Sequence, residues 1–167
     1  MTSKAFAEVV RVIDSMPFLM AASDWDDTML GPEKRISRPN RAAVRALRQL
    51  GLLVVPCTGR VYQHTLPYHQ SLRLKGPIVA SDGALVRIPG GKIIQEIFLC
   101  PEIAASLRES AKKHNITALT HTRDGIFATR GALWNKDADR HRLELGSYFH
   151  YCRPEDLTDV PLSLIHI

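Results

Sequence analysis

The chain has 167 residues, of which 45% are hydrophobic and 23% are charged, a composition typical of a soluble globular protein with one domain, or one domain and part of a second. No apolar run approaches the roughly 20 residues of a membrane span, and no signal peptide is evident, so we expect a cytoplasmic protein. The net charge of +5 suits an anionic partner, but Lys and Arg are scattered and lack the interleaved aromatic residues of nucleic-acid binders. A phosphorylated small molecule explains this charge as well as a nucleic acid does.

The first elements alternate between helical and strand-like patterns. Apolar residues at helical spacing predict a helix over Lys4–Ser15, and a continuous apolar run predicts a buried strand over Phe18–Ser23. Gly, Pro and several charged residues in 31–39 are typical of a loop. A second helix is expected over Asn40–Leu50, with Gly51 at a position that ends many helices.

The next elements continue the alternation of strand and helix. A buried strand is expected over Leu52–Val55, a helix over Val61–Leu72 and a third strand over Pro77–Ala80. This order is typical of a doubly wound, Rossmann-like α/β fold with a parallel sheet. Ligands of such sheets bind outside the carboxyl ends of the strands, where Asp24 and Thr58 are expected to lie.

From residue 84 onward the pattern is that of an α+β unit. The expected elements are a hairpin over Ala84–Ile88 and Lys92–Ile97, a helix over Pro101–His114, and strands over Ile116–Thr120 and Ile126–Thr129. Because the pattern changes there from alternating strands and helices to hairpins and a helix, we place a boundary near residues 81–83. We therefore expect two units, residues 1–83 and 84–167.

An acidic cluster directly follows the first expected strand, where Asp24–Thr28 reads Asp-Trp-Asp-Asp-Thr. Two carboxylates two residues apart can reach one site if the chain curls after the first. Asp24 could then act as a nucleophile and Asp26 as a general acid and base, with a divalent cation keeping the first carboxylate ionised. The alternative is an acidic turn whose side chains make only local hydrogen bonds.

The second strand leads into Thr58-Gly59-Arg60, which opens the next helix. A hydroxyl, backbone N–H groups and a helix N-terminus at this point can form a small anion site. Gly59 permits close approach of the backbone, and Arg60 could contact a phosphate or an acidic residue. Alternatively, Thr58 is a helix N-cap followed by a turn glycine.

Together these segments resemble the haloacid dehalogenase superfamily of phosphotransferases. The family's first motif, Asp-x-Asp-x-Thr after an apolar strand, corresponds to Asp24–Thr28, and its second, a strand ending in Ser or Thr, to Thr58. The Thr-Gly-Arg sequence and the turn Ser81-Asp82-Gly83-Ala84 are similar to the Cof-type subgroup, in which Asn usually stands in place of Asp82. The resemblance implies an incomplete doubly wound core over residues 1–83 and an incomplete α+β cap domain over 84–167.

The resemblance also implies a magnesium-dependent phosphatase that acts on a small phosphomonoester. Asp24 would form an aspartyl-phosphate, and Asp26 would protonate the leaving group and then activate water. The Asp24 carboxylate and the Asp26 backbone carbonyl would bind Mg²⁺. The residues expected to contact the phosphoryl group or the substrate are Thr28, Thr58, Gly59, Arg60 and Asp82.

The family's third and fourth motifs, a Lys and a Gly-Asp pair beyond the cap, have no counterpart in this sequence. No Gly-Asp pair follows Gly125, and no Lys follows Lys136. Without them the charge of Asp24 and phosphate is poorly compensated and Mg²⁺ loses a carboxylate ligand, so we expect a C-terminally truncated chain that is a poor phosphatase. The last residues, Leu162–Ile167, are either an ordinary apolar strand or the translation of a sequencing adapter.

Three other functions stay open on the sequence alone. A phosphomutase of the same superfamily would use the same aspartyl-phosphate. A non-catalytic module would keep the phosphate site without turnover. A basic nucleic-acid-binding domain would show a steeply salt-dependent affinity for DNA.

Several residues near the expected site are assigned structural roles. Trp25 is expected to pack beneath the acidic loop, and His64 and His69 to lie on a helix surface rather than to bind a metal. The three cysteines are widely spaced and odd in number, which predicts buried free thiols in a reducing cytoplasm rather than disulfides.

Overall fold

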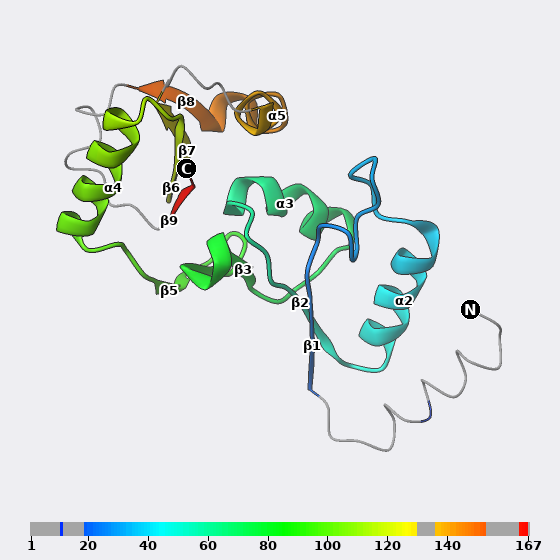
Figure 1. The fold of residues 1–167 in the computed structure, drawn as a ribbon. Helices are drawn as coiled ribbons and strands as arrows, with labels where there is room; N and C mark the ends of the chain where they lie inside the picture. The colour runs from blue at the N-terminus through cyan, green and yellow to red at the C-terminus, as the bar shows by residue number, and fades with distance from the viewer. Residues whose placement is uncertain (1–10, 12–18, 130–135, 153–163, 167) are drawn as a thin grey trace.

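The computed structural model describes residues 11, 19–129, 136–152 and 164–166, so the helix expected over Lys4–Ser15 lies, apart from Arg11, outside the described residues. The chain forms two parts that follow each other in sequence (Figure 1). The first part contains β1 (Met20–Ser23), α2 (Arg38–Gln49), β2 (Leu53–Pro56), α3 (Tyr62–Ser71), β3 (Ile78–Ala80), the 3-10 turn η1 (Ser81–Gly83), β4 (Leu85–Arg87) and β5 (Ile93–Glu96). The second part contains α4 (Pro101–Lys113), β6 (Ala118–Thr122), β7 (Gly125–Thr129), α5 (Lys136–Leu145), the 3-10 turn η2 (Gly146–Tyr148), β8 (Phe149–Cys152) and β9 (Leu164–His166).

The first part is built on a parallel arrangement of strands. β1 pairs with β2 in parallel, with Ala21 opposite Val54, and a parallel bridge between Cys57 and Val79 brings the end of β2 beside β3. Parallel strands need crossover connections, which α2 and α3 provide. The predicted order of strands and helices is therefore confirmed, and the carboxyl ends of β1, β2 and β3 meet along one edge.

Local sequence accounts for the two ends of α2. The Ser37 hydroxyl accepts a hydrogen bond from the Asn40 N–H at 3.2 Å, and Pro39 occupies the first turn, where its missing N–H costs nothing. The helix therefore starts two residues earlier than predicted, because Pro39 opens it and does not belong to the loop. Gly51 follows the helix with φ +83°, as expected for its end.

The strand that leads to Asp24 is less buried than its apolar sequence predicts. Leu19 is 82% exposed and Met20 is 55% exposed. The expectation of a buried strand is wrong for these residues, because β2 is the only strand paired with β1 among the described residues.

The second part is a four-stranded sheet in the order β8-β7-β6-β9, with α4 and α5 beside it (Figure 1). The helix predicted over Pro101–His114 and the antiparallel pair around Asp124-Gly125 are confirmed. α5 and β8 were not predicted from the sequence. Leu164–His166 pairs with β6 as an antiparallel strand.

The hairpin predicted after residue 83 is present, and it forms a three-stranded sheet with β3. β4 pairs antiparallel with β3, with Leu85 opposite Ala80, and β5 pairs with β4. The sheet thus crosses the expected boundary near residues 81–83, and the position of that boundary stays a prediction.

Buried apolar clusters hold the parts in place. One cluster joins α2, β2 and the loop after β1 and consists of Trp25, Leu30, Ile36, Val44, Val54, Leu72 and Leu74. Another includes Val61, at the start of α3, together with Leu119, Ile126, Ala128, Leu145 and Phe149 of the second part. Val61 is 1% exposed, so the beginning of α3 is packed against the second part.

Two further expectations can be compared with the described residues. The cysteines are free as predicted, but Cys100 is exposed, and Cys57 and Cys152 are only half-buried, so the prediction of burial is wrong. No helix in the described ranges is long and apolar enough to cross a membrane.

Candidate active site

The segment after β1 forms a tight turn around a buried tryptophan. Trp25 is 1% exposed, which confirms its expected packing role. Its carbonyl accepts hydrogen bonds from the N–H groups of Met29 at 3.0 Å and Leu30 at 2.7 Å, and these bonds close the turn. Burial of Trp25 leaves Asp24 exposed on one side of it and Asp26 half-buried on the other.

Asp26 is held by two cations from different segments. Arg60 donates to it from Nε at 2.6 Å and from Nη2 at 2.8 Å, and Lys34 donates from Nζ at 2.6 Å. The Arg60 hydrogen bonds, followed by those of Lys34, hold the pKa of Asp26 far below its usual range, although partial burial acts in the opposite direction. Asp26 is therefore an ionised carboxylate in this arrangement and has no proton to donate.

Asp24 lies where the ends of β1 and β2 meet. The Cys57 N–H donates to the Ser23 carbonyl at 2.9 Å, which sets the two strand ends side by side. Burial and, secondly, the negative charge of Asp24 raise the pKa of the Cys57 thiol. One oxygen of the Asp24 carboxylate accepts the Trp25 N–H at 2.7 Å.

The Thr58–Arg60 segment is tied by its backbone to the turn after β3. The Thr58 N–H donates to the Val79 carbonyl at 3.0 Å, the Asp82 N–H to the Thr58 carbonyl at 3.1 Å, and the Ser81 N–H to the Arg60 carbonyl at 2.9 Å. The buried Thr58 hydroxyl accepts a hydrogen bond from the Arg60 N–H at 3.2 Å. The structure therefore brings Thr58, Arg60 and Asp82 together, as the strand order predicts.

Gly59 and Asp82 approach each other closely. A Cβ at residue 59 would lie 3.0 Å from Oδ1 of Asp82, so a side chain there would require the Asp82 carboxylate to shift by a few tenths of an ångström. Asp82 has φ +54°, a left-handed conformation that Asp adopts more readily than most residues. The alternative in which Thr58 caps the next helix is wrong, because α3 begins at Tyr62 with Val61 as its N-cap.

Thr28 is the predicted site residue that stands apart. It is exposed, and its backbone carbonyl, rather than its hydroxyl, is held by Nδ2 of Asn40 at 3.1 Å. Within the described part of the chain, no hydrogen bond joins the Thr28 side chain to Asp24, Asp26 or Thr58.

Lys34 is a member of the site that the sequence analysis did not identify. Its carbonyl accepts the Tyr68 hydroxyl at 3.0 Å, which ties the loop after β1 to α3. Lys34 has φ +53°, a conformation that is costly for a residue other than glycine and is often maintained at functional sites. In the sequence, Lys34 is only a basic residue in an expected loop. Its positive φ and its contact with Asp26 could not be predicted from the sequence.

Glu144 is the second unpredicted member, and it comes from α5 in the second part. Its carboxylate lies 3.6 Å from Nη1 of Arg60 and 3.2 Å from Nε2 of His64. The Arg60 and His64 side chains are only 9% and 4% exposed, whereas the Glu144 side chain is 27% exposed, so each contact is shielded from solvent on one side. Arg60 therefore connects Asp26 in the first part with Glu144 in the second.

The expectation that His64 and His69 lie on a helix surface is wrong. His64 is 5% exposed and His69 is 3% exposed. Both parts of the molecule pack against α3, so little of this helix is left free. His69 Nε2 lies 2.9 Å from the Gly76 carbonyl, and burial lowers the pKa of His69 despite this hydrogen bond.

The residues around Asp24 offer oxygen ligands for a divalent cation. The described residues contain no group of three or more His, Cys, Asp and Glu that could hold a metal. Mg²⁺ often uses only one or two carboxylates and completes its coordination with water and phosphate oxygens. The exposed Asp24 carboxylate is a ligand of the kind that such a sparse set uses.

Known proteins are similar to this chain in sequence. A family model described as haloacid dehalogenase-like hydrolase matches residues 21–163. The HMP-PP phosphatase of Serratia proteamaculans is 28% identical over 134 residues, which cover 80% of this chain and 47% of that protein. The 5-amino-6-(5-phospho-D-ribitylamino)uracil phosphatase YitU of Bacillus subtilis is 35% identical over 77 residues, which cover 46% of this chain and 28% of that protein. The chain thus spans less than half the length of either relative in these matches.

Solved structures show the same fold. A haloacid dehalogenase-like hydrolase from B. subtilis superposes with a TM-score of 0.70 at 20% identity, over 87% of this chain and 59% of that one. A sugar phosphatase described as subclass IIB superposes with a TM-score of 0.71 at 16% identity, over 86% of this chain and 55% of that one. The predicted α/β fold class is therefore confirmed.

Proposed function

Because the chain belongs to the family of haloacid dehalogenase-like hydrolases, as its motifs indicated, we propose that it carries the nucleophile side of the active site of a cytoplasmic phosphatase. One observation carries this proposal: Asp24, Asp26 and Thr58 follow neighbouring parallel strands and meet at one edge of the sheet. The relatives are phosphatases whose names specify phosphorylated small molecules, which supports a small phosphomonoester as the substrate class.

The proposed reaction has two steps. A carboxylate oxygen of Asp24 attacks the substrate phosphorus, the ester P–O bond breaks, and the leaving oxygen takes a proton from Asp26. In the second step Asp26 removes a proton from water, whose oxygen attacks the phosphorus, releasing inorganic phosphate and restoring the Asp24 carboxylate. Exposure of Asp24 leaves its carboxylate accessible for this attack.

Other residues would hold the phosphoryl group between these steps. We assign the Thr58 hydroxyl and the backbone N–H of Gly59 to its oxygens, since Thr58 is fixed by backbone bonds to β3. Bound Mg²⁺, held by the Asp24 carboxylate and the Asp26 carbonyl, would supply positive charge to the phosphate oxygens. Asp82 places a carboxylate beside this position, next to Gly59.

The two cations on Asp26 give this proposal a specific requirement. Asp26 acquires a proton only if Arg60 or Lys34 moves away from it, because together they keep it ionised. A phosphate dianion near Asp24 would compete with Asp26 for these cations. Lys34 and Arg60 would then supply part of the positive charge that the family's third-motif Lys provides.

The pairing of Asp26 with Arg60 and Lys34 also favours a second candidate function, a module that binds a phosphate ligand without turnover. An Asp26 that stays paired with Arg60 and Lys34 cannot act as a general acid. The phosphate site formed by Thr58 and Gly59 does not depend on that proton.

Hydrolysis of p-nitrophenyl phosphate with Mg²⁺ distinguishes the two candidates. The assay uses the 167-residue chain and, beside it, the product of the complete reading frame in the source DNA, each with an Asp24→Asn variant. Asp27→Asn is the matched control, because Asp27 is an exposed neighbour in the same turn. We expect weak or no turnover from the 167-residue chain, and turnover from the complete product that Asp24→Asn abolishes and Asp27→Asn retains. Orthophosphate binding without turnover by the complete product would favour the binding module. Turnover that survives Asp24→Asn would contradict the assignment of Asp24 as the nucleophile.

A further inference from the structure

The positive charge of the protein is concentrated in one segment. Residues 34–81 contain nine Lys and Arg and no Asp or Glu, whereas the other residues contain 13 Lys and Arg and 17 Asp and Glu. The net charge of +5 therefore comes entirely from this segment. Lys34 and Arg60 pair with Asp26, Arg60 also pairs with Glu144, and most of the others lie on or beside α2.

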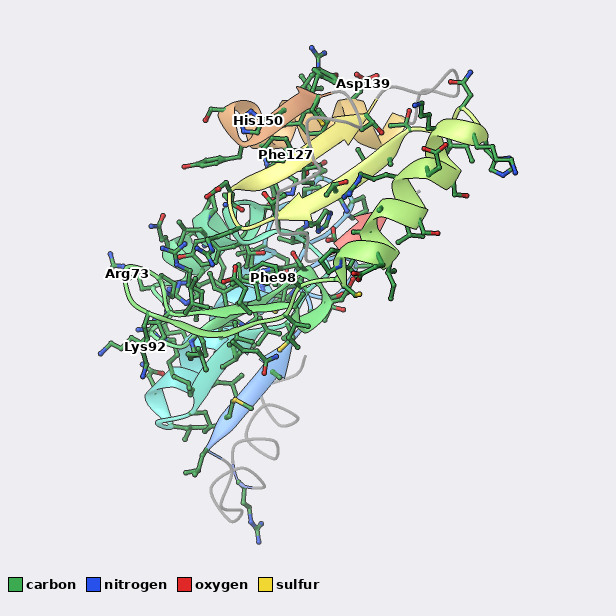
Figure 2. The ribbon with its side chains drawn as sticks, turned by 90° about the vertical axis from the view of Figure 1, so that its left-hand side faces the viewer. Arg73, Lys92, Phe98, Phe127, Asp139 and His150 are labelled. Atoms are coloured by element: carbon green, nitrogen blue, oxygen red, sulfur yellow. The ribbon has the colours of Figure 1, made fainter. Side chains whose placement is uncertain are left out.

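Four of these arginines line one pocket between α2 and the end of α3. The pocket has a volume of about 460 Å³, and Arg41, Arg45, Arg48 and Arg73 contribute to its wall. The first three lie on one face of α2, since they are spaced by four and three residues. Arg73 approaches from the turn after α3, and Figure 2 shows its side chain at the outer surface.

The described residues do not compensate these charges. None of the four arginines forms a salt bridge with a carboxylate within the described ranges, and α2 contains no acidic residue at all. Arginine stays protonated under all ordinary conditions, so the guanidinium groups repel one another. Arg48 donates to the Leu72 carbonyl at 3.0 Å, and Arg73 has φ +52°, a costly conformation for a side chain of this size.

We propose that this pocket binds a small anion with several negative charges, of the di- or triphosphate class. Guanidinium groups pair with phosphate oxygens through two parallel hydrogen bonds, and several of them suit an anion with several phosphates. Among the described residues no aromatic side chain lines the pocket, so the proposal concerns the phosphates and not a nucleobase. The lining shares no residue with the site around Asp24, so this is a second site and does not depend on catalysis.

Isothermal titration calorimetry with inorganic tripolyphosphate tests the proposal on the 167-residue chain. EDTA is present throughout, so that no divalent cation supports binding near Asp24. The pocket variants are Arg41→Gln with Arg45→Gln, and separately Arg73→Asn, in which Asn tolerates the positive φ. Arg38→Gln is the matched control, since Arg38 belongs to the same helix and does not line the pocket. A Thr58→Val variant tests whether tripolyphosphate binds instead at the candidate active site around Asp24 and Thr58.

We expect the double variant to weaken tripolyphosphate binding at least tenfold, and Arg73→Asn to weaken it severalfold. Arg38→Gln and Thr58→Val should change the affinity less than twofold. No measurable binding by the wild type, or an equal loss in Arg38→Gln, would overturn the proposal, the latter because it would indicate diffuse surface charge. Loss in Thr58→Val would place the anion at the other site. Tighter binding of duplex DNA at equal phosphate concentration, with a steep salt dependence, would indicate a nucleic-acid surface instead.

Discussion

At the scale of single residues, Asp26 is the group whose state decides what the site can do. Arg60 contacts it with two nitrogens and Lys34 with one, and Arg60 also reaches Glu144. A guanidinium matches both oxygens of a carboxylate, which an ammonium cannot do. The ionised state of Asp26 therefore depends more on Arg60 than on Lys34.

Replacing Arg60 with Lys should raise the pKa of Asp26 toward its usual range. The substitution keeps the positive charge but loses the paired hydrogen bonds that are the main cause of the lowered pKa. Carbon-13 NMR titration of the Asp26 carboxyl group measures this shift directly. Arg35→Lys, in the neighbouring loop, is the control and should leave the Asp26 pKa unchanged. If the wild-type Asp26 already titrates in the usual range, the contacts of Arg60 and Lys34 with Asp26 are absent in solution.

Sequence patterns identify the residues of this site that follow strands, but not those that reach it from elsewhere. Asp24 and Thr58 could be predicted because each follows an apolar strand, and parallel strands end at a common edge. Lys34 depends on a left-handed loop conformation, and Glu144 on how the second part packs over α3. Neither feature leaves a periodic signal in the chain.

At the scale of elements, α5 connects the two parts at the site. Glu144→Gln removes a charge that faces Arg60 and His64, both largely shielded from solvent. We expect faster amide hydrogen exchange in α5 and at the start of α3, with α4 unchanged, because α5 then packs less firmly on α3. Glu109→Gln on α4 is the control. Unchanged exchange in α5 would mean that apolar packing around Val61 alone holds this contact.

Gly125 tests a second contact between elements, that between the start of β7 and η2. An added Cβ would clash with the Tyr148 carbonyl oxygen, which is backbone and has little freedom to move, and Gly125 has φ +146°. Gly125→Ala should therefore lower the free energy of unfolding by about 3 kcal/mol or more. Gly31→Ala, where no atom lies within 4 Å of the added Cβ, should change it by less than about 0.5 kcal/mol. Urea denaturation measures the free energy of unfolding of both variants. Equal changes in the two variants would contradict the close contact between Gly125 and Tyr148 of η2.

The elements themselves were predictable where the pattern was strong. Continuous apolar runs and helical spacing located β2, β3, α3 and α4 to within a few residues. The sequence of α5, Lys136–Leu145, is rich in charge and has few apolar positions, so its helical period is weak. The burial of β1 was overestimated because an apolar run predicts a strand but not its neighbours.

At the scale of the whole molecule, a buried histidine makes stability depend on pH. Burial lowers the pKa of His69, so below about pH 6.5 the unfolded chain binds a proton that the folded chain excludes. The free energy of unfolding should then fall as the pH is lowered from 7 to 5, by at most about 1.4 kcal/mol per unit from this group. His69→Gln should reduce this slope, while His114→Gln, exposed at the end of α4, should not. Urea denaturation at several pH values gives the slope, and an unchanged slope in His69→Gln would rule out His69 as its source.

The overall architecture followed from the order of elements, whereas charge at the scale of the molecule did not. A count along the sequence shows that residues 34–81 carry nine Lys and Arg and no acidic residue, but only the fold gathers Arg41, Arg45, Arg48 and Arg73 around one pocket. That Arg73 meets the arginines of α2 depends on the helical spacing in α2 and on where α3 ends, which a linear count of charges does not show.

The central claim is that Asp24 is a phosphoryl-accepting nucleophile, and trapping its phosphorylated form tests this most directly. The protein from the complete reading frame is mixed with p-nitrophenyl phosphate and Mg²⁺, quenched in acid and reduced with borohydride, which converts an aspartyl-phosphate to homoserine. Peptide mass spectrometry then locates the altered residue. We predict homoserine at position 24 and its absence in Asp24→Asn. Homoserine at Asp26 or Asp27, or none in a protein that turns over the substrate, would contradict it.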